Sequence, residues 1–186
     1  MTGRDDRDLA RVQDEPCEEC GFDPLATAPE DLADAVRGLG RRYRAALTRF
    51  LPGEDPAVIV RARPDPATWS ALEYACHTRG ALSVLDGRIR TTLTDDEPQL
   101  GWWDHEAAAA DEAYNDQDPG TVADGLDEAA AHLAETLRSV PAGAWDRAAR
   151  RGEDRFTVVG LGRYALHEGH HHLLDVGRAL RTARGR

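Results

Sequence analysis

Four of the seven histidines lie in one short segment near the end of the chain. Residues 166–175 read LHEGHHHLLD, and within them His167 and His171 are four residues apart. On an α-helix this spacing places two imidazoles on one face, about one turn apart, where both can bind one ion. A hydrogen-bonded or solvated histidine cluster is the ordinary alternative, but the ligand spacing favours a metal site.

Two imidazoles are too few for tight binding, so a third ligand must come from elsewhere in the chain. His77 is the best placed, because it lies in the middle of a predicted helix on a secondary apolar face. His105 follows two tryptophans in a connecting segment, and His132 lies among alanine and glutamate and is expected in solvent. We therefore predict a divalent metal site of His77, His167 and His171, with Zn preferred and Ni or Fe as alternatives.

The other residues capable of chemistry have less defined roles. Cys17 and Cys20 form a CxxC that is half of a zinc site, a redox pair or two ordinary thiols. Glu73 and Glu168 are acid-base candidates, although helix capping more often explains a residue like the former, and a solvated helix face one like the latter. Asp175 can orient a ligand histidine from behind. No residue is assigned a catalytic role.

Four long helices must position these residues, and their ends are marked by capping signals. Ser70 and Glu73 form a capping box that opens the second helix, and Asp118 and Thr157 precede the third and fourth. A short helix is predicted over 103–114, in the connection between the second and third. The four expected helices are 32–50, 71–93, 119–140 and 158–184.

The pattern predicts an all-α fold, a four-helix bundle with a long crossover between helices two and three. That connection, of some twenty-five residues, leaves room for a parallel or diagonal arrangement of the two helices. We divide the chain into a polar N-terminal arm with the CxxC, residues 1–26, and a bundle, residues 27–186.

The composition limits the function classes. A net charge of -11 and a pI near 5.0 argue against nucleic-acid binding, which needs a basic surface. No signal peptide or membrane span is readable, so we expect a cytoplasmic protein without a membrane partner. Three cysteines exclude a disulfide scaffold. The 23 basic residues are all arginine, which is typical of a G+C-rich genome.

Two segments together resemble a known family. Residues 69–77 (WSALEYACH) and 167–175 (HEGHHHLLD) are similar to the DinB/YfiT-like superfamily of bacterial metal-binding four-helix bundles, over roughly residues 31–184. In that family, one histidine of helix two and two of helix four hold the metal. The resemblance therefore implies the same three ligands, His77, His167 and His171.

The resemblance implies several activities. Members include transferases and isomerases that use mycothiol, bacillithiol or glutathione, so we expect a metal-dependent thiol S-transferase, with mycothiol as the first choice of thiol. A metal-dependent hydrolase of small molecules is the alternative, because residues 167–171 satisfy HExxH, in which the glutamate acts on a metal-bound water. The third reading is a non-enzymatic bundle that binds metal or a partner. A homodimer fits each of them.

Overall fold

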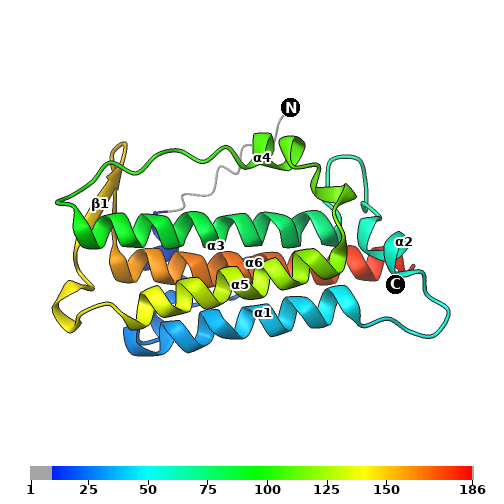
Figure 1. The fold of residues 1–186 in the computed structure, drawn as a ribbon, viewed down its shortest axis with the longest axis horizontal. Coiled ribbons are helices and arrows are strands. Elements are labelled where there is room, and N and C mark those ends of the chain that lie inside the picture. The colour runs from blue at the N-terminus through cyan, green and yellow to red at the C-terminus, as the bar shows by residue number, and fades with distance from the viewer. Residues whose placement is uncertain (1–9, 186) are drawn as a thin grey trace.

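Four long helices build the structure, a computed structural model that describes residues 10–185 (Figure 1). They lie side by side as a bundle, which confirms the predicted fold class, and the first nine residues of the predicted arm lie outside the described residues. The bundle helices are α1 (Leu32–Thr48), α3 (Ala71–Thr94), α5 (Pro119–Arg138) and α6 (Val158–Ala183).

Side-chain caps fix where these helices begin. The Ser70 hydroxyl accepts from the Glu73 backbone N–H, and the Glu73 carboxylate accepts from the Ser70 N–H at 2.8 Å, so the predicted capping box is present. Asp118 caps α5 and Thr157 caps α6, as their sequence positions predicted. Because these caps satisfy backbone donors that the helices leave unpaired, they set the register of each helix.

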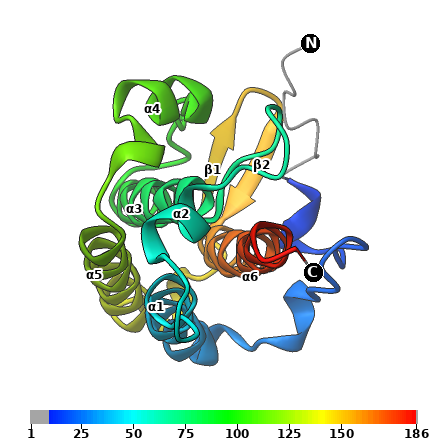
Figure 2. The same ribbon diagram turned by 90° about the vertical axis from the view of Figure 1, so that its right-hand side faces the viewer.

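Two of the bundle helices run in the direction opposite to the other two (Figure 1). α1 and α6 run one way along the long axis, and α3 and α5 run the other way (Figure 1). Seen from one end, the order around the square is α1, α5, α3, α6 (Figure 2). The connection 95–118 returns along the bundle, so α3 and α5 are parallel neighbours, which confirms the predicted crossover.

Short elements complete the fold. α2 (Pro56–Arg61) follows α1, and α4 (His105–Asp111) lies in the crossover, where the sequence predicted a short helix. The strands β1 (Ala148–Arg151) and β2 (Asp154–Thr157) form an antiparallel hairpin before α6. Short 3-10 turns join these elements: Arg11–Gln13, Pro24–Ala26, Pro29–Asp31, Tyr114–Asp116 and Ala142–Ala144.

The arm before α1 lies against α6. Val12 and Phe22 are buried, and the Gln13 side chain donates to the Arg155 carbonyl at 3.1 Å and accepts from the Thr157 N–H. The arm therefore reaches the N-terminal end of α6 and follows that helix to the histidine segment. Across residues 10–185, none of the helices has the length and apolar character of a membrane span.

Candidate metal centre

Two pairs of potential ligands follow each other on α6, displaced by one residue. His167 and His171 form one pair, and Glu168 and His172 form the other, each with a spacing of four. One residue along an α-helix is a rotation of about 100°, so the two pairs leave the helix in different directions. All four side chains are buried. The elements packed on α6 therefore decide which pair meets which partner.

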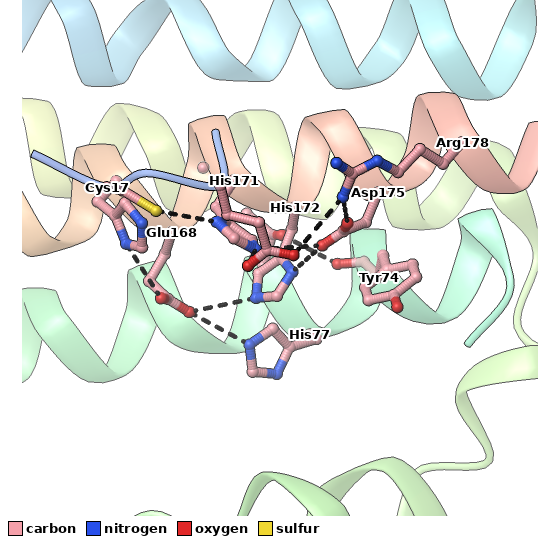
Figure 3. A network of polar contacts seen from close by, with 12 residues as sticks. Cys17, Tyr74, His77, Glu168, His171, His172, Asp175 and Arg178 are labelled. Carbon is pink, nitrogen blue, oxygen red and sulfur yellow. Dashed lines mark hydrogen bonds and ion pairs between the residues drawn. The ribbon is translucent and has the colours of Figure 1, made fainter. Parts of the chain in front are cut away.

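The Glu168 and His172 pair faces α3, where it meets His77 (Figure 3). Glu168 Oε2 lies 3.4 Å from His77 Nε2 and 3.4 Å from His172 Nε2. One ligand atom from each of the three residues lies within 4.8 Å of the others, and all three residues are buried. We call His77, Glu168 and His172 the first group.

Neighbouring side chains hold the first group in place. Asp175 Oδ2 lies 3.1 Å from His172 Nδ1, so the carboxylate orients the ring with Nε2 toward Glu168. The His77 ring stacks on Trp103, with 5.3 Å between ring centroids and 17° between the planes. Trp69 packs on the same imidazole at 5.3 Å. These contacts leave both histidines few alternative rotamers.

The electrostatics of the first group require a positive charge. Burial raises the pKa of Glu168, but the surrounding His167, His172 and His77 hold that pKa well below its ordinary value. Burial lowers the pKa of His172, yet Asp175 and Glu168 together raise it to about 9. Burial lowers the pKa of His77, which is therefore a neutral imidazole at pH 7.

The residues of the first group fit a divalent metal ion. A buried carboxylate is costly unless a cation compensates it, and Glu168 is surrounded by imidazoles rather than by arginine. Two imidazoles and one carboxylate are ligands that Zn and Fe(II) accept in catalytic sites. His77, Glu168 and His172 would be the three donors to a metal ion at this position, and its charge would replace that of the proton on His172.

The second pair on α6, His167 and His171, faces the N-terminal arm. There it meets Cys17 and Cys20, and one ligand atom from each of the four residues lies within 4.8 Å of the others. Cys17 Sγ lies 3.7 Å from His171 Nδ1. We call these four residues the second group.

The structure divides the three histidines that the sequence analysis joined. His167 and His171 lie together, whereas His77 lies with Glu168 and His172, and the two groups share no residue. That His77, His167 and His171 bind one ion stays a prediction. The geometry favours Glu168 and His172 as the ligands that act together with His77. His172 and Glu168 were missed as ligands, although their spacing of four was the same available signal.

The other residues that the sequence offered as candidates for chemistry differ in burial and in contacts. Glu73 is occupied by the α3 cap and by an ion pair with Arg63, which agrees with capping rather than catalysis. Cys76 is a buried core thiol, and His132 is exposed, both as expected. Glu168, which the HExxH pattern placed on the site of His167 and His171, lies next to His167 but also contacts His77 and His172, and it is buried, not solvated.

A pocket of about 300 Å³ opens beside the first group. All three residues of that group line it, so the centre is accessible from the pocket. The walls carry aromatic rings and two arginines, and His105 reaches the same space. The wall includes three tryptophans, Trp69, Trp102 and Trp103, and the two arginines are Arg88 and Arg151.

Comparison with known proteins supports this architecture. The family model described as DinB superfamily matches residues 41–176. Among solved structures, the chain is similar to YfiT from Bacillus subtilis, described as a probable metal-dependent hydrolase with an unusual four-helix bundle topology, at a TM-score of 0.72 and 16% identity. The similarity covers 84% of this chain and 87% of that one. No curated protein matches the chain.

Proposed function

This chain belongs to the DinB superfamily, and on that premise we propose that it is a metal-dependent enzyme that hydrolyses a small molecule. One observation carries the proposal: His77, Glu168 and His172 converge beside a pocket and all three line it. Three protein ligands leave a coordination position for water or substrate, as in catalytic zinc sites, whereas four would close the site. When bound, a divalent metal supplies Lewis acidity and lowers the pKa of a bound water.

The pocket walls indicate the chemistry of the substrate. Trp69, Trp102 and Trp103 offer flat apolar surfaces, and Arg88 and Arg151 supply positive charge. The Arg151 guanidinium lies over the Trp102 ring at 5.5 Å, which holds it at the wall. This combination fits a small molecule with an apolar body and an anionic group, since guanidinium binds carboxylate and phosphate well.

His105 is the pocket residue suited to moving a proton. Its ring packs edge-on against His77 with centroids 5.5 Å apart, and its Nε2 lies 3.9 Å from a Glu106 carboxylate oxygen. Neutral imidazole can accept a proton from water on one nitrogen and release it to a leaving group. We assign His105 this role, while Asp175 keeps His172 oriented and has no direct part.

The likeness to YfiT supports hydrolysis from a separate direction. That protein is described as a probable metal-dependent hydrolase, and the two chains share the bundle topology at a TM-score of 0.72. At 16% identity the shared fold does not identify the substrate of this chain. The substrate class is therefore inferred from the residues of its own pocket.

Thiol transfer is the second candidate, because the coordination position that accepts water also accepts a thiolate. Among the described residues, no cysteine lines the pocket, so the thiol would come from a small cofactor such as mycothiol. Metal binding would lower the pKa of that thiol and aim it at an electrophile in the pocket.

One two-armed assay separates these functions. Zinc-loaded protein is supplied with carboxylate-bearing esters and amides and their neutral isosteres, and separately with monochlorobimane plus mycothiol, bacillithiol or glutathione. We expect metal-dependent hydrolysis that prefers the anionic substrates and is lost in Glu168→Ala. The Arg151→Gln variant should lose the preference for anions but keep the reaction. Turnover in the thiol arm alone would favour the second candidate, and no metal-dependent turnover in either arm would contradict both.

A further inference from the structure

The second group lies outside the proposed catalytic centre and combines residues from two distant parts of the chain. Cys17 and Cys20 belong to the arm, outside the residues 41–176 that the family model matches, whereas His167 and His171 belong to α6. We propose that these four residues bind a second metal ion, a structural zinc that fastens the arm to the bundle. This proposal does not depend on the hydrolase function.

The donor set is that of a closed zinc site. Two thiolates and two imidazoles fill four tetrahedral positions, and soft sulfur ligands select zinc over magnesium or calcium. A tetrahedral zinc places its sulfur and nitrogen ligands about 3.5 Å apart, from Zn–S of about 2.3 Å and Zn–N of about 2.0 Å. The Cys17 Sγ to His171 Nδ1 distance of 3.7 Å agrees with this spacing.

The arm folds so that both thiols meet α6. The Cys17 carbonyl accepts from the Gly21 N–H at 2.8 Å, and the Cys17 N–H donates to the Phe22 carbonyl at 2.8 Å, which closes a tight turn. Gly21 has φ +72°, a left-handed conformation that glycine adopts without strain. Phe22 then packs on His167, with 5.7 Å between ring centroids. The turn and its aromatic anchor thus bring the CxxC to the histidine pair.

His167 supplies an independent sign of a ligand. Its side chain is fully buried, and within the described residues neither ring nitrogen has a hydrogen-bond partner. A buried polar atom without a partner costs about 1–3 kcal/mol, so leaving both nitrogens unpaired is unfavourable. The Nδ1 atom faces Glu168 Oε1 at 3.6 Å, beyond hydrogen-bond length. A zinc ion on one nitrogen of His167 removes part of this cost.

The surrounding charges favour a cation. Glu19 Oε2 lies 3.5 Å from His171 Nε2, and Asp175 Oδ2 lies 3.7 Å from the same nitrogen. With Nδ1 toward Cys17, these carboxylates stand behind the ligand ring in the place where an orienting acceptor is usual. Two thiolates beside these carboxylates would repel them, and the charge of Zn²⁺ offsets that of the thiolates.

Metal content of the reduced protein tests the proposal. Purified without a histidine tag and with reductant present, the wild type should hold two zinc ions per chain. The Cys17→Ser/Cys20→Ser variant should hold one and keep the hydrolytic centre. The His77→Ala/His172→Ala variant should also hold one, so failure of the catalytic centre is read separately. Cys76→Ala is the matched control, a buried thiol outside both groups, and should keep both ions.

Cobalt substitution identifies the ligands even where a variant folds poorly. Thiolate-to-cobalt charge-transfer absorption should be present in the wild type and in His77→Ala/His172→Ala, and absent from Cys17→Ser/Cys20→Ser. Equal metal content and equal absorption in the wild type and the cysteine variant would overturn the proposal. A Cys17–Cys20 disulfide that persists in reductant, with one ion per chain, would overturn it as well.

Discussion

Replacing Gly169 by alanine tests how closely α6 approaches α1 beside the metal centre. A Cβ at residue 169 would lie 2.3 Å from Leu39 Cδ1 and 2.8 Å from Leu39 Cδ2. Carbon atoms prefer separations of about 3.5–4.0 Å, so the end of Leu39 must move by more than about 1 Å. Leu39 is fully buried, and its neighbours have to move with it.

Two opposing contributions determine how Gly169→Ala changes the free energy of unfolding. Overpacking of this kind destabilises a protein by about 1–3 kcal/mol, whereas replacing a glycine inside a helix by alanine stabilises it by about 1 kcal/mol. Gly177→Ala is the matched control in the same helix, since the nearest atom to its Cβ is the flexible end of Arg181 at 3.6 Å. We expect Gly177→Ala to be stabilising and Gly169→Ala to be less stable than it by about 1–3 kcal/mol. For a chain of this size the difference in Tm is about 2–12 °C.

Thermal and urea unfolding of both variants in chelator measure this difference without a contribution from metal binding. Leu39→Ala should cost less in the Gly169→Ala background than in the wild type, because the smaller side chain leaves room for the new methyl group. Stabilisation by Gly169→Ala equal to that of Gly177→Ala, with additive effects of Leu39→Ala, would refute the close approach.

Four further predictions concern the caps and the metal. Ser70→Ala should lower the free energy of unfolding by about 1–2 kcal/mol, since the hydroxyl caps a buried first turn; an unchanged urea midpoint would argue against the capping box. EDTA should lower the Tm of the wild type, and added zinc should restore it; a Tm indifferent to chelation would argue against bound metal. Asp175→Ala should weaken zinc binding about 10–100-fold in calorimetric titration, because it removes the acceptor behind His172; equal affinity would contradict its orienting role. His132→Ala should change stability by less than about 0.5 kcal/mol and leave the metal content intact, and lost zinc would mean that this exposed histidine is a ligand.

The helices were predictable because their ends are encoded locally. Ser70, Asp118 and Thr157 each cap the helix that the sequence placed behind them. α2 and the β-hairpin were not predicted, because six-residue and four-residue elements carry too few apolar positions for a periodic signal. Gly152, with φ +61°, marks the hairpin turn, a signal that is weak without knowledge of the flanking strands.

The metal centre was predictable in kind but not in detail. The spacing of four holds for His167 and His171 and equally for Glu168 and His172, and no local property decides which pair faces His77. Only the packing of α6 against α3 and against the arm makes that choice. Four clustered histidines also make imidazole the obvious ligand type, so Glu168 was expected to be a solvated or acid-base residue rather than a ligand.

Anomalous diffraction at the zinc edge, from crystals of the zinc-loaded protein, shows directly which residues surround the metal beside the pocket. We predict an anomalous peak bounded by His77, Glu168 and His172, beside the aromatic pocket. A single peak that joins His77 to His167 and His171 would contradict it and restore the ligand set expected from the resemblance.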